Sequence, residues 1–255
     1  MLRKSAVFIW QNPVVLLPVL LARVVDFAIY WVCGLAKGPA MKAVAPRSVL
    51  GGYSGKVNGA VLLLAALFTF LPLICEVALL LYAMVVSGRW AHAIRETGSA
   101  EGKTWEAPAS GVARTGLLSL SVGAVTAVVG LYFTLHGGVP VRWSYLVTWC
   151  FLILASWFLA PSWLRLLAQV EGVRFRDTSK IPPFVAVALG LTGFAACIYL
   201  GGAVQHSLES AHRIHGAVVL FAINLVAACL SAIPLAFSFV AMSRYVAERP
   251  GWTTE

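Results

Sequence analysis

Residues 216–246 read GAVVLFAINLVAACLSAIPLAFSFVAMSRYV, and this stretch decides the fold class. Its only charged residue is Arg244, which stands close to its end. A helix needs ~20 apolar residues to cross the hydrocarbon of a bilayer, where every backbone amide must find its partner inside the segment. The stretch therefore predicts a transmembrane helix.

Five earlier stretches have the same character, and together with the first they predict six spans. The longest ones predict tilt or an end that protrudes from the bilayer. Residues 5–11 predict a short amphipathic helix on the membrane surface before Pro13. The sequence thus predicts an all-α polytopic membrane protein in which residues 1–255 form one six-helix transmembrane domain with a short N-terminal interfacial helix. The predicted spans are residues 13–36, 57–87, 115–136, 144–169, 183–204 and 216–246.

The composition of the whole chain agrees with this fold class. Hydrophobic residues make up 60% and charged residues 11%, whereas about a quarter of a soluble domain is charged. The net charge of +9 would suit nucleic acid, but Lys and Arg lie in short segments between apolar runs. That pattern fits anionic lipid headgroups, so we expect the lipid bilayer and no nucleic acid as a partner.

The distribution of basic residues predicts the orientation, because cytoplasmic segments carry an excess of Lys and Arg. With the N-terminus inside, the outer segments hold six: Lys37, Lys42, Arg47, Lys56, Arg142 and Arg213. The inner segments hold twelve: Arg3, Lys4, Arg89, Arg95, Lys103, Arg114, Arg165, Arg174, Arg176, Lys180, Arg244 and Arg249. We therefore expect a prokaryotic inner membrane with both termini cytoplasmic, although the first outer loop departs from the rule.

Three ionisable residues fall well inside the predicted membrane region: Arg23, Asp26 and Glu76. An unpaired charge there costs ~3 kcal/mol or more, so each residue requires a partner. Arg23 and Asp26 share one helix face, and Glu76 reaches a similar depth on the antiparallel second span. The spacing predicts an Arg23–Glu76 ion pair with Asp26 beside it. It favours a structural clasp of the first hairpin and leaves a proton or substrate site open.

Small and polar residues recur on one face of three spans, which predicts close helix packing. Tryptophans near the span ends suggest aromatic belts at the membrane surfaces. The packing stripes are Gly116, Gly123 and Gly130, then Gly190, Gly193, Cys197 and Gly201, and finally Asn224, Ser231 and Ser238. The belt residues are Trp10, Trp31, Trp90, Trp143 and Trp163.

Two further groups of residues were weighed as binding sites. Zinc or copper would accept an outer histidine set, but its spacing matches no standard ligand motif, so no cofactor is expected. A basic cluster at the inner surface could bind lipid headgroups, or could serve topology alone. The histidines are His136, His206, His212 and His215, and the basic cluster is Arg174, Arg176 and Lys180.

Short motifs resemble a loose group of six-span prokaryotic membrane families. The group includes the membrane domain found beside glycerophosphodiester phosphodiesterases, as well as families of unknown function. The similar segments are Trp10-Gln-Asn12-Pro13-Val-Val-Leu-Leu-Pro18, the stretch from Ser87 to Gly98, and Phe158-Leu-Ala-Pro161 with Val170-Glu-Gly172-Val. The resemblance implies a six-helix bundle and maps no catalytic residue onto this chain.

Three functions remain open at this point, and none is enzymatic, because no nucleophile elbow or His-Glu-x-x-His motif is present. The sequence favours a scaffold, assembly factor or accessory subunit that contacts other membrane subunits. The alternatives are a permease half of an ABC-type exporter, whose segment 88–114 would contact a separate ATPase, and a small proton or ion carrier. The carrier would use Arg23, Asp26 and Glu76.

Overall fold

The computed structural model describes residues 2–44, 59–98, 109–135, 141–170, 181–210 and 217–248. Within these ranges all regular secondary structure is helical, so the fold is all-α as predicted. The elements are α1 (Leu2–Gln11), the 3₁₀ turn η1 (Pro13–Leu16), α2 (Leu17–Val44), α4 (Gly59–Thr97), α5 (Ala109–Leu135), α6 (Val141–Val170), α7 (Ile181–Ser210) and α8 (Ala217–Ala247).

Among the described residues, five helical segments are long and apolar enough to cross a membrane, which indicates a multi-pass membrane protein. They are Pro13–Ala36, Phe70–Thr97, Ile153–Val170, Pro182–Gln205 and Val218–Ala247. The side chains exposed on the bundle include many large apolar ones, among them Leu63, Leu154 and Val218. Such an exterior is what lipid requires as a solvent.

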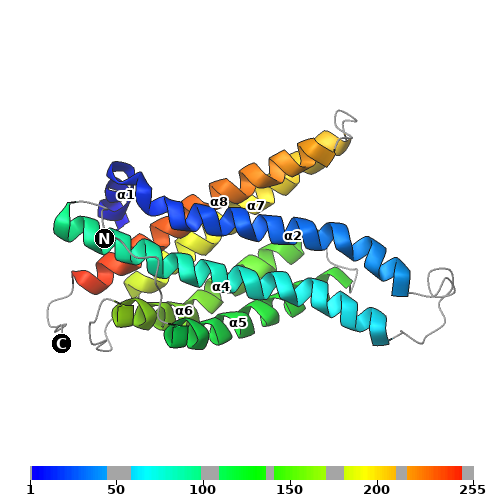
Figure 1. Ribbon diagram of the computed structural model, residues 1–255, viewed down its shortest axis with the longest axis horizontal. Helices are drawn as coiled ribbons and strands as arrows, with labels where there is room; N and C mark the ends of the chain where they lie inside the picture. The colour runs from blue at the N-terminus through cyan, green and yellow to red at the C-terminus, as the bar shows by residue number, and fades with distance from the viewer. Residues whose placement is uncertain are drawn as a thin grey trace.

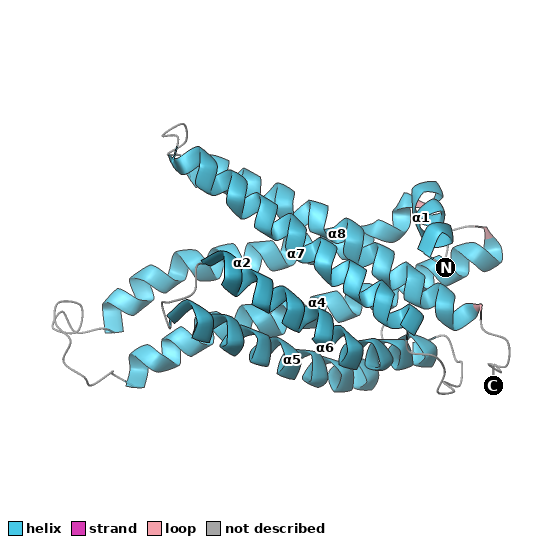
Figure 2. Cartoon of the chain, turned by 180° about the vertical axis from the view of Figure 1, so that it is seen from behind, coloured by secondary structure: helices cyan, strands magenta, loops and turns pink. Residues whose placement is uncertain are grey.

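The long helices run alternately in opposite directions and pack as three hairpins, α2–α4, α5–α6 and α7–α8 (Figure 1). At one end of the bundle, where α1 lies, the hairpins are packed together. Toward the other end the α7–α8 hairpin diverges from the rest, as both ribbon views show (Figure 2). The molecule is therefore a fork whose base is the α1 end.

The main hydrophobic core lies at the base of this fork. It combines the first half of α2 with the second halves of α4, α6 and α8 and the start of α7. Its largest fully buried side chains include Phe239, Leu81, Met84, Leu166, Leu167 and Met242. Because the core as a whole draws residues from five helices, the base holds the three hairpins together.

The α7–α8 hairpin is held by close backbone approach along the two small-residue stripes predicted for packing. A Cβ added at Gly190 would lie 2.5 Å from Ser238 Cβ. A Cβ at Gly201 would lie 2.6 Å from Ala227 Cβ, and the one at Gly193 would meet Pro234 at 2.5 Å. No real Cβ contact is this short, so only glycine fits here. The α7–α8 hairpin consequently behaves as a closely packed unit.

Helix α1 lies across the base of the fork, with the buried Ser5 and the partly buried Phe8 and Ile9 facing inward. Trp10 is 89% exposed, and Arg3 and Lys4 are also exposed. The helix ends at Gln11. The next residue, Asn12, donates its Nδ2 to the Phe8 carbonyl at 3.1 Å, and Pro13 follows without an amide hydrogen to donate. Ser87 Oγ then donates to the Val15 carbonyl at 2.8 Å and fixes η1 against α4.

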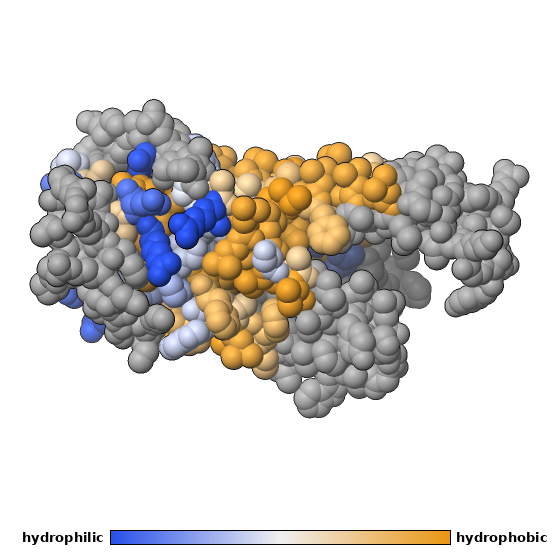
Figure 3. All heavy atoms as spheres, turned by 90° about the horizontal axis from the view of Figure 1, so that it is seen from below, coloured by the Kyte–Doolittle hydropathy of each residue, from blue (hydrophilic) through white to orange (hydrophobic). Residues whose placement is uncertain are grey.

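Hydrophilic side chains gather at the base of the fork on the face seen in Figure 3, and an apolar band lies beside them. Arg244 lies in the last turn of α8, and its Nη2 lies 2.6 Å from Glu248 Oε1. The hydrogen bond from Arg244 lowers the pKa of the Glu248 carboxyl. Exposed basic residues near this end are Arg3, Lys4, Arg114 and Arg165.

Two local predictions were wrong. Helix α4 continues to Thr97 instead of ending near residue 87, because an apolar run marks the hydrocarbon and a helix can continue beyond it. The segment from Ser87 to Thr97 is consequently helical. Trp90 and Trp163 are 6% and 7% exposed, so they belong to the core and not to an aromatic belt.

Candidate functional site

Three ionisable residues of α2 lie on one helical face. Arg23, Asp26 and Tyr30 are spaced by three and four residues, which places them one above another along the helix. That face points toward α4 and α8, and Arg23 and Asp26 are 4% and 2% exposed. The local helix geometry thus brings a cation, a carboxylate and a phenol to one side of α2.

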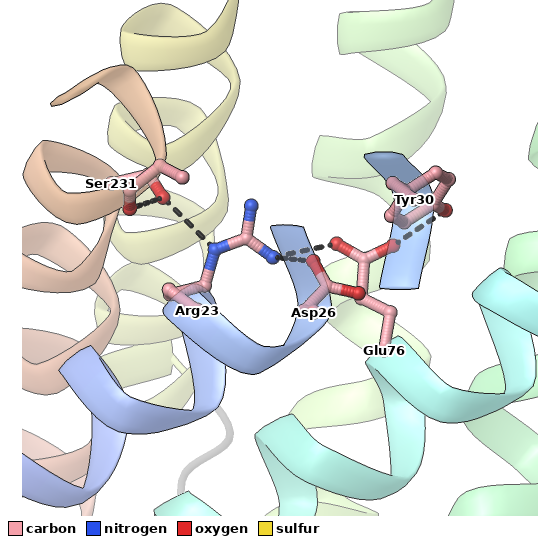
Figure 4. Close-up of polar contacts among 6 residues, drawn as sticks. Arg23, Asp26, Tyr30, Glu76 and Ser231 are labelled. Atoms are coloured by element: carbon pink, nitrogen blue, oxygen red, sulfur yellow. Dashed lines mark hydrogen bonds and ion pairs between the residues drawn. The ribbon is translucent and has the colours of Figure 1, made fainter. Parts of the chain in front are cut away.

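The Arg23 guanidinium is the centre of the cluster (Figure 4). Its Nη1 lies 2.5 Å from Asp26 Oδ2 and 3.1 Å from Glu76 Oε1. Its Nε donates to Ser231 Oγ at 3.0 Å, and its Cζ lies 4.7 Å from the centre of the Phe194 ring. Contacts from α4, α7 and α8 therefore surround a single cation on α2.

The second carboxylate oxygen of Glu76 also contacts α2. Tyr30 donates its hydroxyl to Glu76 Oε2 at 3.2 Å, and the Glu76 side chain is 16% exposed. The structure brings Arg23, Asp26 and Glu76 together as the sequence predicted, and it adds Tyr30 and Ser231. The cluster joins the first hairpin to α8.

The cluster holds more acidic than basic groups. Of the described residues it contains one cation, Arg23, and two carboxylates, Asp26 and Glu76. Asp26 Oδ1 is buried and has no hydrogen-bond partner among the residues that the structure describes. Leaving an ionised oxygen buried and unpaired is costly in protein or lipid. The arrangement is therefore suited to taking up one further positive charge.

A cavity of about 530 Å³ adjoins the cluster, between α2 and the α7–α8 hairpin. Its walls include Arg23, Asp26 and Glu76, and its other polar side chains are Tyr30 and Asn224. Most of the lining is aromatic or apolar: Phe27, Trp31, Phe194, Ile198, Ala227 and Ala228. Apolar walls with a few convergent polar groups are typical of small-molecule sites of this size.

The aromatic side of the cavity is supported from behind. Phe221 of α8 packs against Phe27 and Trp31, with ring centres 5.1 and 5.0 Å apart. On the same helix, Asn224 Nδ2 donates to Gln205 Oε1 at 3.0 Å. The ring contacts hold Phe27 and Trp31 of α2 against α8, and the Asn224–Gln205 bond joins α8 to α7.

A smaller cavity of about 150 Å³ continues from the cluster toward the base of the fork. Glu76 and Phe194 line both cavities. The smaller one is otherwise almost wholly apolar and reaches core residues such as Leu81 and Phe239. Its polar contact is Trp163 Nε1, which donates to Ser119 Oγ at 3.2 Å. Glu76 thus lies between the larger cavity, which holds the charged groups, and a smaller, almost wholly apolar one.

The other predicted binding residues lie largely outside the described part of the chain. Arg174, Arg176 and Lys180 fall there, as do His136, His212 and His215. His206 belongs to α7, but its side chain is not described. Within the described ranges, no group of three potential ligands could hold a metal ion. Metal and headgroup binding by these residues stay untested predictions.

Sequence reasoning missed three members of the site. Tyr30 could have been found, because it stands four residues after Asp26 on the same helical face. Ser231 was assigned to a packing stripe, and packing is only part of its role, since it also accepts the bond from Arg23. Phe194 gave no sequence signal for its place beneath the guanidinium.

No family model, curated protein or solved structure matches this chain.

Proposed function

We propose that this chain is a non-enzymatic carrier of protons or small monovalent cations in a prokaryotic inner membrane. The observation that carries the proposal is the cluster itself, in which one buried and one partly buried carboxylate face one guanidinium beside a cavity of about 530 Å³. A structural clasp needs one carboxylate for Arg23. A cation-binding site would in addition need a second carboxylate and a cavity, and this cluster has both.

The proposed topology has six crossings and places both termini in the cytoplasm. α5, at 27 residues, supplies the sixth crossing, because it is long enough and packs antiparallel to α6. Exposed Arg3, Lys4, Arg114 and Arg165 near the base of the fork support a cytoplasmic base. In this arrangement α1 lies in the inner membrane surface, and the fork opens toward the outside.

The two other functions predicted from the sequence have less support. The exposed apolar side chains suit lipid and do not require a partner subunit, so the scaffold ranks second. The ABC permease would use segment 88–114 as a coupling loop, yet 88–97 continue α4 and 109–114 begin α5. No feature of the described residues specifically favours an ATPase partner.

Flux measurements on purified protein in liposomes test the carrier. Protons are followed with a trapped pH dye, and cations with labelled rubidium and tetramethylammonium. We expect flux of at least one of these above empty vesicles, and we expect Asp26→Asn and Glu76→Gln to abolish it. Glu96→Gln is the matched control, because Glu96 is exposed and pairs with His92 away from the cluster. Flux at the level of empty vesicles would contradict the carrier and leave the scaffold.

A further inference from the structure

The walls of the large cavity indicate which cation the site takes. We infer that it binds a monovalent organic cation, an amine or quaternary ammonium with an apolar body, whose charge lies against Asp26. This inference rests on the proposed cation site and specifies its ligand class. Three properties of the cavity carry it: its charge, its aromatic walls and its small number of oxygen ligands.

The charge of the site selects a single positive charge. Arg23 is already engaged by Asp26 Oδ2, Glu76 Oε1 and Ser231 Oγ. Across the described lining, one guanidinium offsets one carboxylate and leaves the other uncompensated. Asp26 is 2% exposed, and its Oδ1 has no partner within the described ranges. A bound monovalent cation would offset the excess negative charge of the cluster.

The aromatic walls select an organic cation. Phe27, Tyr30 and Trp31 come from α2, and Phe194 comes from the opposite side on α7. Aromatic faces attract ammonium groups through their quadrupole, and sets of such rings recognise quaternary ammonium ligands. The protein already uses this interaction, since the Arg23 guanidinium lies over Phe194. The remaining rings offer similar surfaces to a ligand.

Divalent metal ions fit these walls poorly, and a proton makes no use of them. Calcium takes six to eight oxygen ligands, and magnesium needs near-ideal octahedral oxygen coordination. The described lining has few oxygen atoms, and most of them already form hydrogen bonds with Arg23 or with each other. A proton needs no cavity. A volume of about 530 Å³ with apolar walls is suited to a molecule that carries its own apolar surface.

Equilibrium dialysis with labelled benzyltrimethylammonium tests the inference on the full chain in detergent. We expect saturable binding that excess sodium chloride does not displace. Neopentylbenzene, in which a neutral carbon replaces the nitrogen of benzyltrimethylammonium, should also fail to displace the labelled ligand. Asp26→Asn should weaken binding about tenfold or more, because it removes the charge that the ligand neutralises. Equal displacement by the neutral isostere would overturn the inference and leave an apolar cavity only.

An aromatic variant gives a second, independent test. Trp31→Leu keeps an apolar side chain but removes the ring, and we expect affinity for benzyltrimethylammonium to fall about tenfold. Trp157→Leu is its matched control, because Trp157 is exposed on α6 and packs against Phe184 outside this lining. Equal affinities of the two variants would contradict the inference even if Asp26→Asn failed to fold.

The binding and flux experiments separate the two proposals. Proton or rubidium flux that depends on Asp26, without benzyltrimethylammonium binding, would overturn the ligand class and support the carrier. Saturable binding that depends on Asp26 and Trp31, without any flux, would support the ligand class and overturn the carrier. The absence of both would overturn both.

Discussion

At the scale of single residues, Arg23 organises everything around it. Its guanidinium contacts groups from four helices and is 4% exposed. Removing one member of a buried ion pair leaves the other charge uncompensated, which typically costs 3–5 kcal/mol in proteins. The same residue therefore holds the first hairpin to α8 and orients the two carboxylates. Stability and binding are coupled at this point.

A double-mutant cycle measures the pairing of Arg23 with Glu76. We expect Arg23→Ala and Glu76→Ala each to lower the free energy of unfolding by ~3 kcal/mol in detergent. The double variant should lose ~1–3 kcal/mol less than the sum, because the two residues share one contact. Arg23→Ala combined with Glu96→Ala is the control and should be additive. Additivity in the first cycle would show that the two residues are not coupled.

At the scale of elements, the α7–α8 hairpin depends on glycine at the points of close approach. A Cβ at Gly190 would lie 2.5 Å from Ser238 Cβ and 3.2 Å from the Pro234 carbonyl oxygen. The backbone oxygen cannot rotate away, so the helices would have to separate. A tight core resists such overpacking at a cost of ~1–3 kcal/mol.

Gly190→Ala tests this packing against Gly202→Ala on the same helix. We expect Gly190→Ala to lower the free energy of unfolding by ~1–3 kcal/mol. Gly202 has open space around it, so its replacement should be neutral or should stabilise α7 by up to ~1 kcal/mol through helix propensity. Thermal unfolding followed by intrinsic fluorescence compares the two. Equal stabilities would mean that the hairpin can separate without loss.

At the scale of the whole molecule, the orientation of the protein in the membrane decides toward which side of the membrane the cavity opens. In a background without native cysteines, Lys4→Cys on α1 should react with an impermeant maleimide only after the membrane of spheroplasts is permeabilised. Lys42→Cys, at the far end of α2, should react in intact spheroplasts. These outcomes follow from a cytoplasmic base with α1 at the inner surface. The reverse pattern would place the opening of the fork in the cytoplasm.

The sequence was informative where one helix or one hairpin determines the geometry. Arg23 and Asp26 are related by helix periodicity alone, and Glu76 follows from the depth of two antiparallel spans. The lengths of the apolar runs located the long helices, because each run belongs to a single helix. The end of α4 at Thr97 could not be found this way, because helix continuation beyond the hydrocarbon depends on tertiary contacts of residues such as Trp90.

The rest of the site depends on how separate hairpins meet. Phe194 and Ser231 belong to helices more than 150 residues after Arg23, and only the assembled core places them beside it. Local patterns carry no information about such approach. Trp163 shows the same limit, because its position near a span end suggests a membrane surface, whereas the packing of α5 against α6 buries it.

The packed base and the diverging α7–α8 hairpin have a mechanical consequence. The α7–α8 hairpin is joined to the other helices at the core. A small rotation of the hairpin about the core would therefore displace its far end by a larger distance. The cavity lies between the core and the far end of the hairpin, where α2 and the α7–α8 hairpin begin to diverge. Any rotation of the hairpin about the core would change the width of the cavity, because the walls of the cavity belong both to α2 and to the hairpin.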